Sequence, residues 1–249
     1  MKYIYTTLLL FTALLIFSCS SDDDTGNNDD TTGATTVLIK KITEKTYNAS
    51  SGGNDVIIEQ TYTYNGNKII STEATQTYDG QISRSKEEFT YTNNLITSVY
   101  YTGEYDTRTY EISYDTNGRV INLFDNFEYL SENEVIVGDD IECEKLILSN
   151  QQINKRYFSD NCKDYQENFE YKYDNNRNAL SNIQGYNWAF MWDWLFSGNT
   201  EYQTTYNNLL NNQDYTFQYD YNENGYPRNV SFFNIDDGTL EGTMAIEYY

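Results

Sequence analysis

The most suggestive chemical pattern in this chain is the spacing of oxygen-bearing side chains in the stretch Tyr219–Phe233. Asp220, Asn222 and Asn224 alternate there with other residues and precede a glycine, which is how a calcium-binding loop begins. A loop of the EF-hand kind also needs a glutamate at its twelfth position, where this chain has Ser231. Asn and Asp side chains that bond their own backbone explain the pattern without a metal. We therefore interpret the stretch as a turn between two strands and predict no metal site and no cofactor.

The chain contains no histidine, which excludes Ser-His-Asp triads, Cys-His dyads and the usual zinc sites. Paired carboxylates are the remaining route to hydrolysis, as in glycosidases. The candidates are Glu87-Glu88, Asp139-Asp140, Asp236-Asp237 and Glu201. Because the chain has 38 acidic residues, such pairs arise by chance, and none lies in an apolar setting that would raise its pKa. We expect no enzyme, and keep a carboxylate-dependent carbohydrate hydrolase as the alternative.

Aromatic side chains gather in one stretch, residues 185–199, which contains all three tryptophans. Trp188 and Trp192 are four residues apart, so a short helix would place them on one face. The candidate ligand-binding residues are Tyr186, Trp188, Trp192 and Trp194. They would form an aromatic platform for a flat ligand such as a sugar ring. The alternative is a plug or cap, because aromatic clusters with few charges are more often buried than displayed.

The N-terminus reads as an export signal. Lys2 is followed by a short apolar run from Leu8 to Phe17, which is too short to span a bilayer, and then by Ser18 and Cys19. This pattern resembles a bacterial lipobox, which implies that Cys19 carries the lipid and begins the mature chain. Residues 1–18 are then the signal peptide. Residues 19–36 are acidic and polar, with too little apolar surface to fold, and form the tether.

The other two cysteines, Cys143 and Cys162, form an even pair in a chain expected in an oxidising compartment. Between them the sequence predicts two strands around a turn near Asn150-Gln151. A disulfide would connect the open ends of that hairpin and contribute roughly 3 kcal/mol by the chain-entropy estimate. A redox-active pair is disfavoured, since few basic groups lie nearby to stabilise a thiolate.

Charge limits the possible partners. The formal net charge is −22 at pH 7, and the basic residues form no cluster. Binding to nucleic acid through phosphate contacts is therefore excluded, because the electrostatic term would be repulsive.

Residues 37–249 carry an internal repeat. Its copies are marked by five tyrosines, here called the anchor tyrosines: Tyr64, Tyr91, Tyr114, Tyr173 and Tyr219. Around each anchor, aromatic or apolar residues alternate with polar ones, and an Asn, Asp or Gly turn follows. This period of two predicts strands with one buried face, joined by hairpin turns. We therefore predict a single all-β domain, an antiparallel up-and-down meander.

The phrase Tyr114-Asp115-Thr116-Asn117-Gly118, and its counterpart from Tyr219 to Gly225, resembles the YD repeats of Rhs-type shells. Together with the lipobox and the acidic tether, it is also similar to an uncharacterised family of Bacteroidetes surface lipoproteins with a porin-like fold. The resemblance implies a barrel and no particular activity. Closure would remove the exposed edges of a meander of about 12–16 strands. Neither strand face suits lipid, so we expect a soluble barrel rather than an inserted pore.

The sequence thus predicts a lipid-anchored, surface-exposed outer-membrane protein. Its expected role is the non-enzymatic binding of a glycan, peptide or partner protein. A structural or assembly component without a small ligand is a further alternative to the hydrolase.

Overall fold

The computed structural model describes residues 37–47, 55–123, 126–138, 142–150, 152–185 and 206–249. These residues form 18 β-strands, and among them no helix is long and apolar enough to cross a membrane. The strands are β1 (Ile39–Thr46), β2 (Val56–Asn65), β3 (Lys68–Tyr78), β4 (Gln81–Thr92), β5 (Leu95–Gly103), β6 (Thr107–Glu111), β7 (Ser113–Tyr114), β8 (Val120–Asn122), β9 (Asn126–Ser131), β10 (Glu134–Gly138), β11 (Cys143–Ser149), β12 (Gln152–Ser159), β13 (Gln166–Glu170), β14 (Lys172–Arg177), β15 (Asn207–Asn211), β16 (Tyr215–Tyr221), β17 (Pro227–Asn234) and β18 (Leu240–Tyr248).

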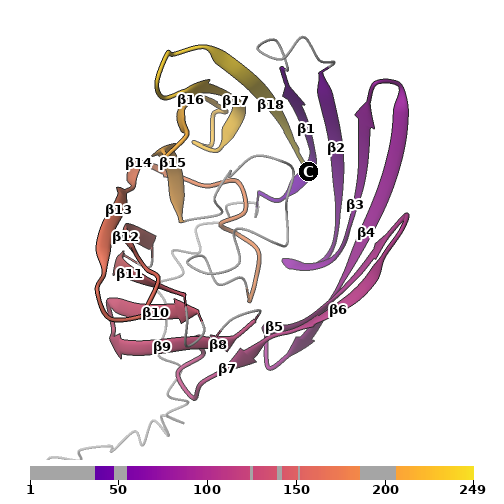
Figure 1. Cartoon of the computed structure of the whole chain (residues 1–249). Helices are drawn as coiled ribbons and strands as arrows, with labels where there is room; N and C mark the ends of the chain where they lie inside the picture. The colour runs from indigo at the N-terminus through magenta and orange to yellow at the C-terminus, as the bar shows by residue number, and fades with distance from the viewer. Residues whose placement is uncertain (1–36, 48–54, 124–125, 139–141, 151, 186–205) are drawn as a thin grey trace, which may run out of the picture. The chain divides into compact units, whose positions relative to one another are not determined.

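The strands belong to two antiparallel sheets (Figure 1). The first has the order β14-β15-β16-β17-β18-β1-β2-β3-β4-β5-β6, and the second has the order β13-β12-β11-β10-β9-β8-β7. Neighbours in a sheet are consecutive in the chain, except that β18 pairs with β1. The predicted all-β, antiparallel meander is therefore confirmed.

The predicted closure into one barrel is not found. A single residue, Ile112, separates β6 from β7, and another, Tyr171, separates β13 from β14. The N–H of Ile112 donates to the carbonyl of Thr97 (2.9 Å), after which β7 pairs with β8 instead of β5. Because the chain changes partner at these two residues, the ladder divides into two sheets. The described residues also form more strands than the expected 12–16.

One hydrophobic cluster takes side chains from both sheets. On β2 the alternation is plain, since Ile58, Gln60 and Tyr62 are buried while the residues between them are exposed. We call the face that carries such residues the inner face. Tyr62 is only 1% exposed, and Ile96 and Val99 on β5 are fully buried. Each such aliphatic side chain contributes about 1.5–3 kcal/mol to folding.

Four of the five anchor tyrosines are hydrogen-bonded through their hydroxyl groups to the backbone of another strand. The hydroxyls of Tyr114, Tyr173 and Tyr219 donate to the backbone carbonyls of Ile96 (2.6 Å), Ile153 (2.6 Å) and Leu209 (2.5 Å). The Tyr91 hydroxyl accepts the N–H of Ile69 at 3.1 Å. The Tyr64 hydroxyl is buried and has no hydrogen-bond partner among the described residues. The repeat found in the sequence is therefore a repeated contact between strands.

The stretch with calcium-like spacing is the hairpin turn between β16 and β17. Asn222 Oδ1 accepts the backbone N–H groups of Asn224 and Tyr226, both at 3.0 Å. Asp115 Oδ1 accepts the N–H groups of Asn117 and Arg119 in the same way. The turn interpretation is confirmed, because the side-chain oxygen of Asn222 bonds its own backbone.

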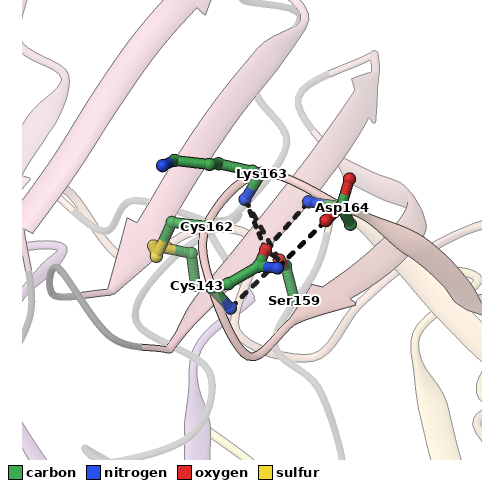
Figure 2. Close-up of a disulfide and its surroundings, with 6 residues drawn as sticks. Cys143, Ser159, Cys162, Lys163 and Asp164 are labelled. Carbon is green, nitrogen blue, oxygen red and sulfur yellow. Dashed lines mark hydrogen bonds between the residues drawn. A yellow bond between two sulfur atoms is a disulfide. The ribbon is translucent and has the colours of Figure 1, made fainter.

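The two cysteines form the predicted disulfide, with 5.1 Å between the Cα atoms of Cys143 and Cys162 (Figure 2). Cys143 begins β11, and Cys162 lies three residues after the end of β12. Ser159 Oγ accepts the backbone N–H of Lys163 at 3.2 Å, and so shapes the loop that carries Cys162. The bond therefore joins the open ends of the β11–β12 hairpin.

Candidate functional site

Several residues that the sequence analysis predicts to be functional lie outside the described part of the chain. Cys19 lies beyond it, as do the aromatic candidates Tyr186, Trp188, Trp192 and Trp194. The same is true of Asp139-Asp140 and Glu201. A candidate site must therefore be built from the two sheets and from the segment that leads toward the aromatic stretch.

That segment, Asn178–Gly185, follows β14 (Figure 1), and its side chains Ala179, Leu180 and Ile183 are buried in the hydrophobic cluster. The amide of Asn182 donates to the carbonyl of Val37 at 2.6 Å and to the Tyr226 hydroxyl at 2.9 Å. The backbone N–H of Gln184 donates to Asn67 in the β2–β3 turn at 2.9 Å. We call Asn178–Gly185 the inner segment. Its contacts with described residues are at the end of the first sheet that carries the β2–β3 turn.

A pocket lies at the opposite end of the first sheet, beside the turns β3–β4 and β5–β6. It has a volume of about 300 Å³. We call it the inner pocket. Its described lining residues are Ile58, Ala74, Gln76, Ser83, Arg84, Ser85, Tyr101, Gly103, Glu104, Tyr105 and Asp106.

The pocket exists because small side chains align across three strands. Ala74 pairs with Ser85, and Ser85 pairs with Gly103, so these three residues share one row of the inner face. A Cβ added to Gly103 would lie 2.5 Å from the Tyr101 hydroxyl oxygen. Glycine therefore lets the Tyr101 side chain lie over the Gly103 end of this row. At the rim, Tyr105 is 92% exposed and presents a second aromatic ring to solvent.

The next row of the inner face contains a carboxyl group with an altered pKa. Thr72 pairs with Glu87, which pairs in turn with Tyr101, so the three side chains share a face. Thr72 Oγ1 donates to Glu87 Oε2 at 2.8 Å. Burial raises the pKa of Glu87 from 4.5 to about 8, and the hydrogen bond from Thr72 only partly offsets this. Glu87 is therefore largely protonated at pH 7.

The expectation that no candidate carboxylate has a raised pKa is thus wrong for Glu87. The two members of the Glu87-Glu88 pair point to opposite faces, as neighbours on a strand must. Glu88 forms an ion pair with Lys86 at 2.9 Å on the outer face. The pair therefore does not act together, and only Glu87 adjoins the inner pocket, next to its lining residues Ser85 and Tyr101.

The Asp236-Asp237 pair belongs to the turn between β17 and β18. Hydrogen bonds from Thr239 lower the pKa of Asp237, whose Oδ1 accepts the Thr239 N–H at 2.8 Å. Asn234 Oδ1 accepts the N–H of Asp236 at 2.9 Å. Both acids therefore serve the turn, and their geometry offers no acid-base chemistry.

Three charged residues line the inner pocket. Arg84 and Glu104 are exposed, and both also line a second groove of about 550 Å³ on β3–β5, which shares Ala74, Ser85 and Gly103 with the inner pocket. Asp106 forms an ion pair with Arg108. In the described part of the chain, no three acidic or cysteine side chains gather as metal ligands. Apart from these three charged residues, the lining consists of aromatic rings, hydroxyls, an amide and small residues, which suits a polar ligand.

Sequence reasoning missed the inner pocket, although one signal pointed to it. Phe89 and Tyr91 mark the buried face of their strand, and counting back by twos places Glu87, Ser85 and Ser83 on that face. A run of small and acidic residues on a face expected to be buried is a local departure from the pattern. Which residues of the neighbouring strands lie beside this run depends on the strand register, which the sequence does not show.

Comparisons with known proteins give a structural similarity but no sequence match. No family model matches the sequence, and no curated protein matches it. Among solved structures, the chain is similar to a porin-like protein from Bacteroides uniformis ATCC 8492, with 14% sequence identity and a TM-score of 0.47. The similarity covers 85% of this chain and 98% of the other.

Proposed function

We propose that this protein is a lipid-anchored protein of the cell surface that binds a glycan without catalysis. The observation that carries the proposal is the inner pocket, in which the Tyr101 ring lies over Gly103, in one row with the small residues Ala74 and Ser85. Sugar rings pack against aromatic faces, while side-chain amides and hydroxyls bond their hydroxyl groups. Gln76 and Ser83 supply such groups in the pocket.

The size of the pocket supports a small ligand portion. A volume of about 300 Å³ lies at the lower end of the range for ligand sites and suits one or two sugar rings. A peptide or partner protein would need a larger apolar contact, and is the weaker reading of this pocket. The exposed ring of Tyr105 offers the next sugar unit a surface at the rim.

The location part of the proposal rests on the N-terminal sequence. The apolar run before Cys19, and the acidic residues after it, support export and lipid attachment. Replacing Cys19 with Ser should move the protein from the membrane fraction to the soluble fraction. If the Cys19→Ser protein stays in the membrane fraction after a salt wash, the lipid anchor is wrong.

Binding is tested with the full chain carrying Cys19→Ser on an array of neutral and acidic glycans. We expect saturable binding that Tyr101→Ala removes. Tyr100→Ala is the matched control, because Tyr100 is the preceding residue of β5, points to the opposite face and is 43% exposed. Equal loss in both variants, or no binding to any glycan, would contradict the proposal.

A hydrolase is the second candidate, because the raised pKa of Glu87 is the property of a general acid. It requires a second carboxylate on the other side of the scissile bond. Glycan hydrolysis that Glu87→Gln abolishes, while glycan binding persists, would replace the binding function with this one. If the protein neither binds nor hydrolyses any glycan, the result would favour a structural component.

A further inference from the structure

We propose that Glu87, which adjoins the lining of the inner pocket, contacts a ligand bound there: it donates its proton in a hydrogen bond to a hydroxyl oxygen of an uncharged glycan and stays protonated while the glycan is bound. This inference rests on the proposed glycan-binding function. To that function it adds a contacting residue (Glu87), a ligand class (uncharged glycans) and a dependence of the binding affinity on pH.

The position of Glu87 supports contact with the ligand. It lies two residues from Ser85 on β4, so both side chains are on the inner face. It is directly opposite Tyr101 on β5. Ser85 and Tyr101 both line the inner pocket. The carboxyl group is therefore next to two residues that would touch a sugar ring in the pocket.

The hydrogen bonds of Glu87 leave one oxygen available. Thr72 Oγ1 donates to Oε2 at 2.8 Å. Among the described residues, the structure gives Oε1 no hydrogen-bond partner, and Glu87 remains partly exposed. A protonated carboxyl with a free oxygen can offer one donor and one acceptor. Adjacent hydroxyls of a sugar ring present the complementary pair.

The surroundings of Glu87 keep its carboxyl neutral. The described side chains next to it on the inner face are Thr72 on β3, Ser85 and Phe89 on β4, and Tyr101 on β5, and none of them is a cation. Arg108, opposite Tyr101 on β6, is engaged by Asp106. Burial raises the pKa of Glu87 to about 8. A ligand that covers the carboxyl excludes more water and disfavours the ionised form further.

Linkage then fixes the direction of the pH effect. If the bound state requires the proton, the affinity for the glycan has its maximum at pH values well below 8 and falls as the pH rises through 8. At pH 9 about one tenth of the free protein would be competent, which weakens the apparent affinity roughly tenfold relative to pH 6. Binding at pH 8 would take up about half a proton per ligand.

The experiment is calorimetric titration of the full chain carrying Cys19→Ser with neutral linear oligosaccharides of glucose, mannose, xylose and galactose. Titrations at pH 6 to 9, in two buffers of different ionisation enthalpy, give both the affinity and the proton uptake. We expect about tenfold weaker binding at pH 9 than at pH 6, with proton uptake at pH 8. Glu87→Gln should remove the pH dependence and the proton uptake, although Arg84, Glu104 and Asp106 still line the pocket. Glu87→Ala should weaken binding at pH 6 by about two- to tenfold, because the hydrogen bond is lost.

Glu88→Gln is the matched control, because Glu88 is the next residue but points to the outer face. It should behave like the parent protein. Binding that is independent of pH and unaffected by Glu87→Ala would overturn the role of Glu87 and leave the glycan-binding function intact. Failure of every oligosaccharide to bind would overturn both. Affinity that rises with pH, with proton release, would show that the ligand prefers the ionised carboxylate and would also overturn the inference.

Discussion

At the scale of single residues, two tyrosine hydroxyls should contribute differently to the free energy of unfolding, because only one of them is hydrogen-bonded within the described part of the chain. Tyr114 donates to the Ile96 carbonyl at 2.6 Å, whereas the buried Tyr64 hydroxyl has no hydrogen-bond partner among the described residues. Tyr114→Phe should lower the free energy of unfolding by about 1 kcal/mol, because a partnered carbonyl loses its donor. Tyr64→Phe removes only an unpartnered hydroxyl and should be neutral or slightly stabilising. Urea denaturation of both variants measures the difference, and equal losses would contradict the hydrogen-bond assignment.

The raised pKa of Glu87 predicts a dependence of stability on pH. The folded pKa of about 8 lies above the ordinary value of 4.5, so the folded protein favours the protonated form. The contribution of Glu87 to stability is therefore greatest below pH 4.5, decreases as the pH rises from 4.5 to 8, and stays constant above. Glu87→Gln, which cannot ionise, should raise the free energy of unfolding at pH 7 by about 1–3 kcal/mol. Urea denaturation from pH 5 to 9 should show a gain that grows up to pH 8; a gain that is constant with pH would contradict the prediction.

At the scale of elements, much of the fold follows from the sequence because the signals are local. Alternation along a strand depends on neighbours two residues apart, and the turn at Asn222 depends on its own backbone bonds. The disulfide follows from the hairpin between its cysteines. In the last repeat copy Tyr219 and Tyr221 share a face, and Tyr219 is the one that donates to a backbone carbonyl, that of Leu209. Tyr221, the tyrosine directly before the turn, donates to Asp174 rather than to a backbone carbonyl.

The contact of the inner segment with the β4–β5 turn gives a test at this scale. Gly185 has a φ of +78°, and a Cβ added there would lie 2.2 Å from the carbonyl oxygen of Asn94. Gly185→Ala should lower the free energy of unfolding by about 2–4 kcal/mol, since backbone strain and a collision with backbone add together. Gly80 has a similar φ of +74° with nothing within 4 Å of the added Cβ, so Gly80→Ala should cost only about 1 kcal/mol. Similar losses, measured by urea denaturation, would refute the close packing of the inner segment.

The disulfide gives a second test of an element. Cys143 and Cys162 are separated by 19 residues, so the closed loop should contribute about 3 kcal/mol. The double variant Cys143→Ala, Cys162→Ala should show a correspondingly lower urea midpoint. Reducing agent should produce the same shift in the parent protein and none in the double variant. A parent protein insensitive to reduction would show that the bond adds nothing to stability.

At the scale of the whole molecule, the sequence could not reveal the division into two sheets. The period-two pattern Tyr110, Ile112, Tyr114 continues without interruption through the residue where the chain exchanges β5 for β8 as its partner. Alternation is a property of one strand, whereas the choice of partner depends on strands elsewhere in the chain. The inner pocket was hidden for the same reason, because Ala74, Ser85 and Gly103 meet only through the register.

The central claim is that the protein binds a glycan in the inner pocket, and hydrogen exchange tests it most directly. Backbone exchange of the full chain carrying Cys19→Ser is measured by mass spectrometry with and without the oligosaccharide that it binds best. We predict slower exchange in peptides that cover residues 73–76, 83–86 and 101–106, which line the pocket, and no change in the second sheet. Protection confined to the second sheet, or no protection at saturating ligand, would contradict the account.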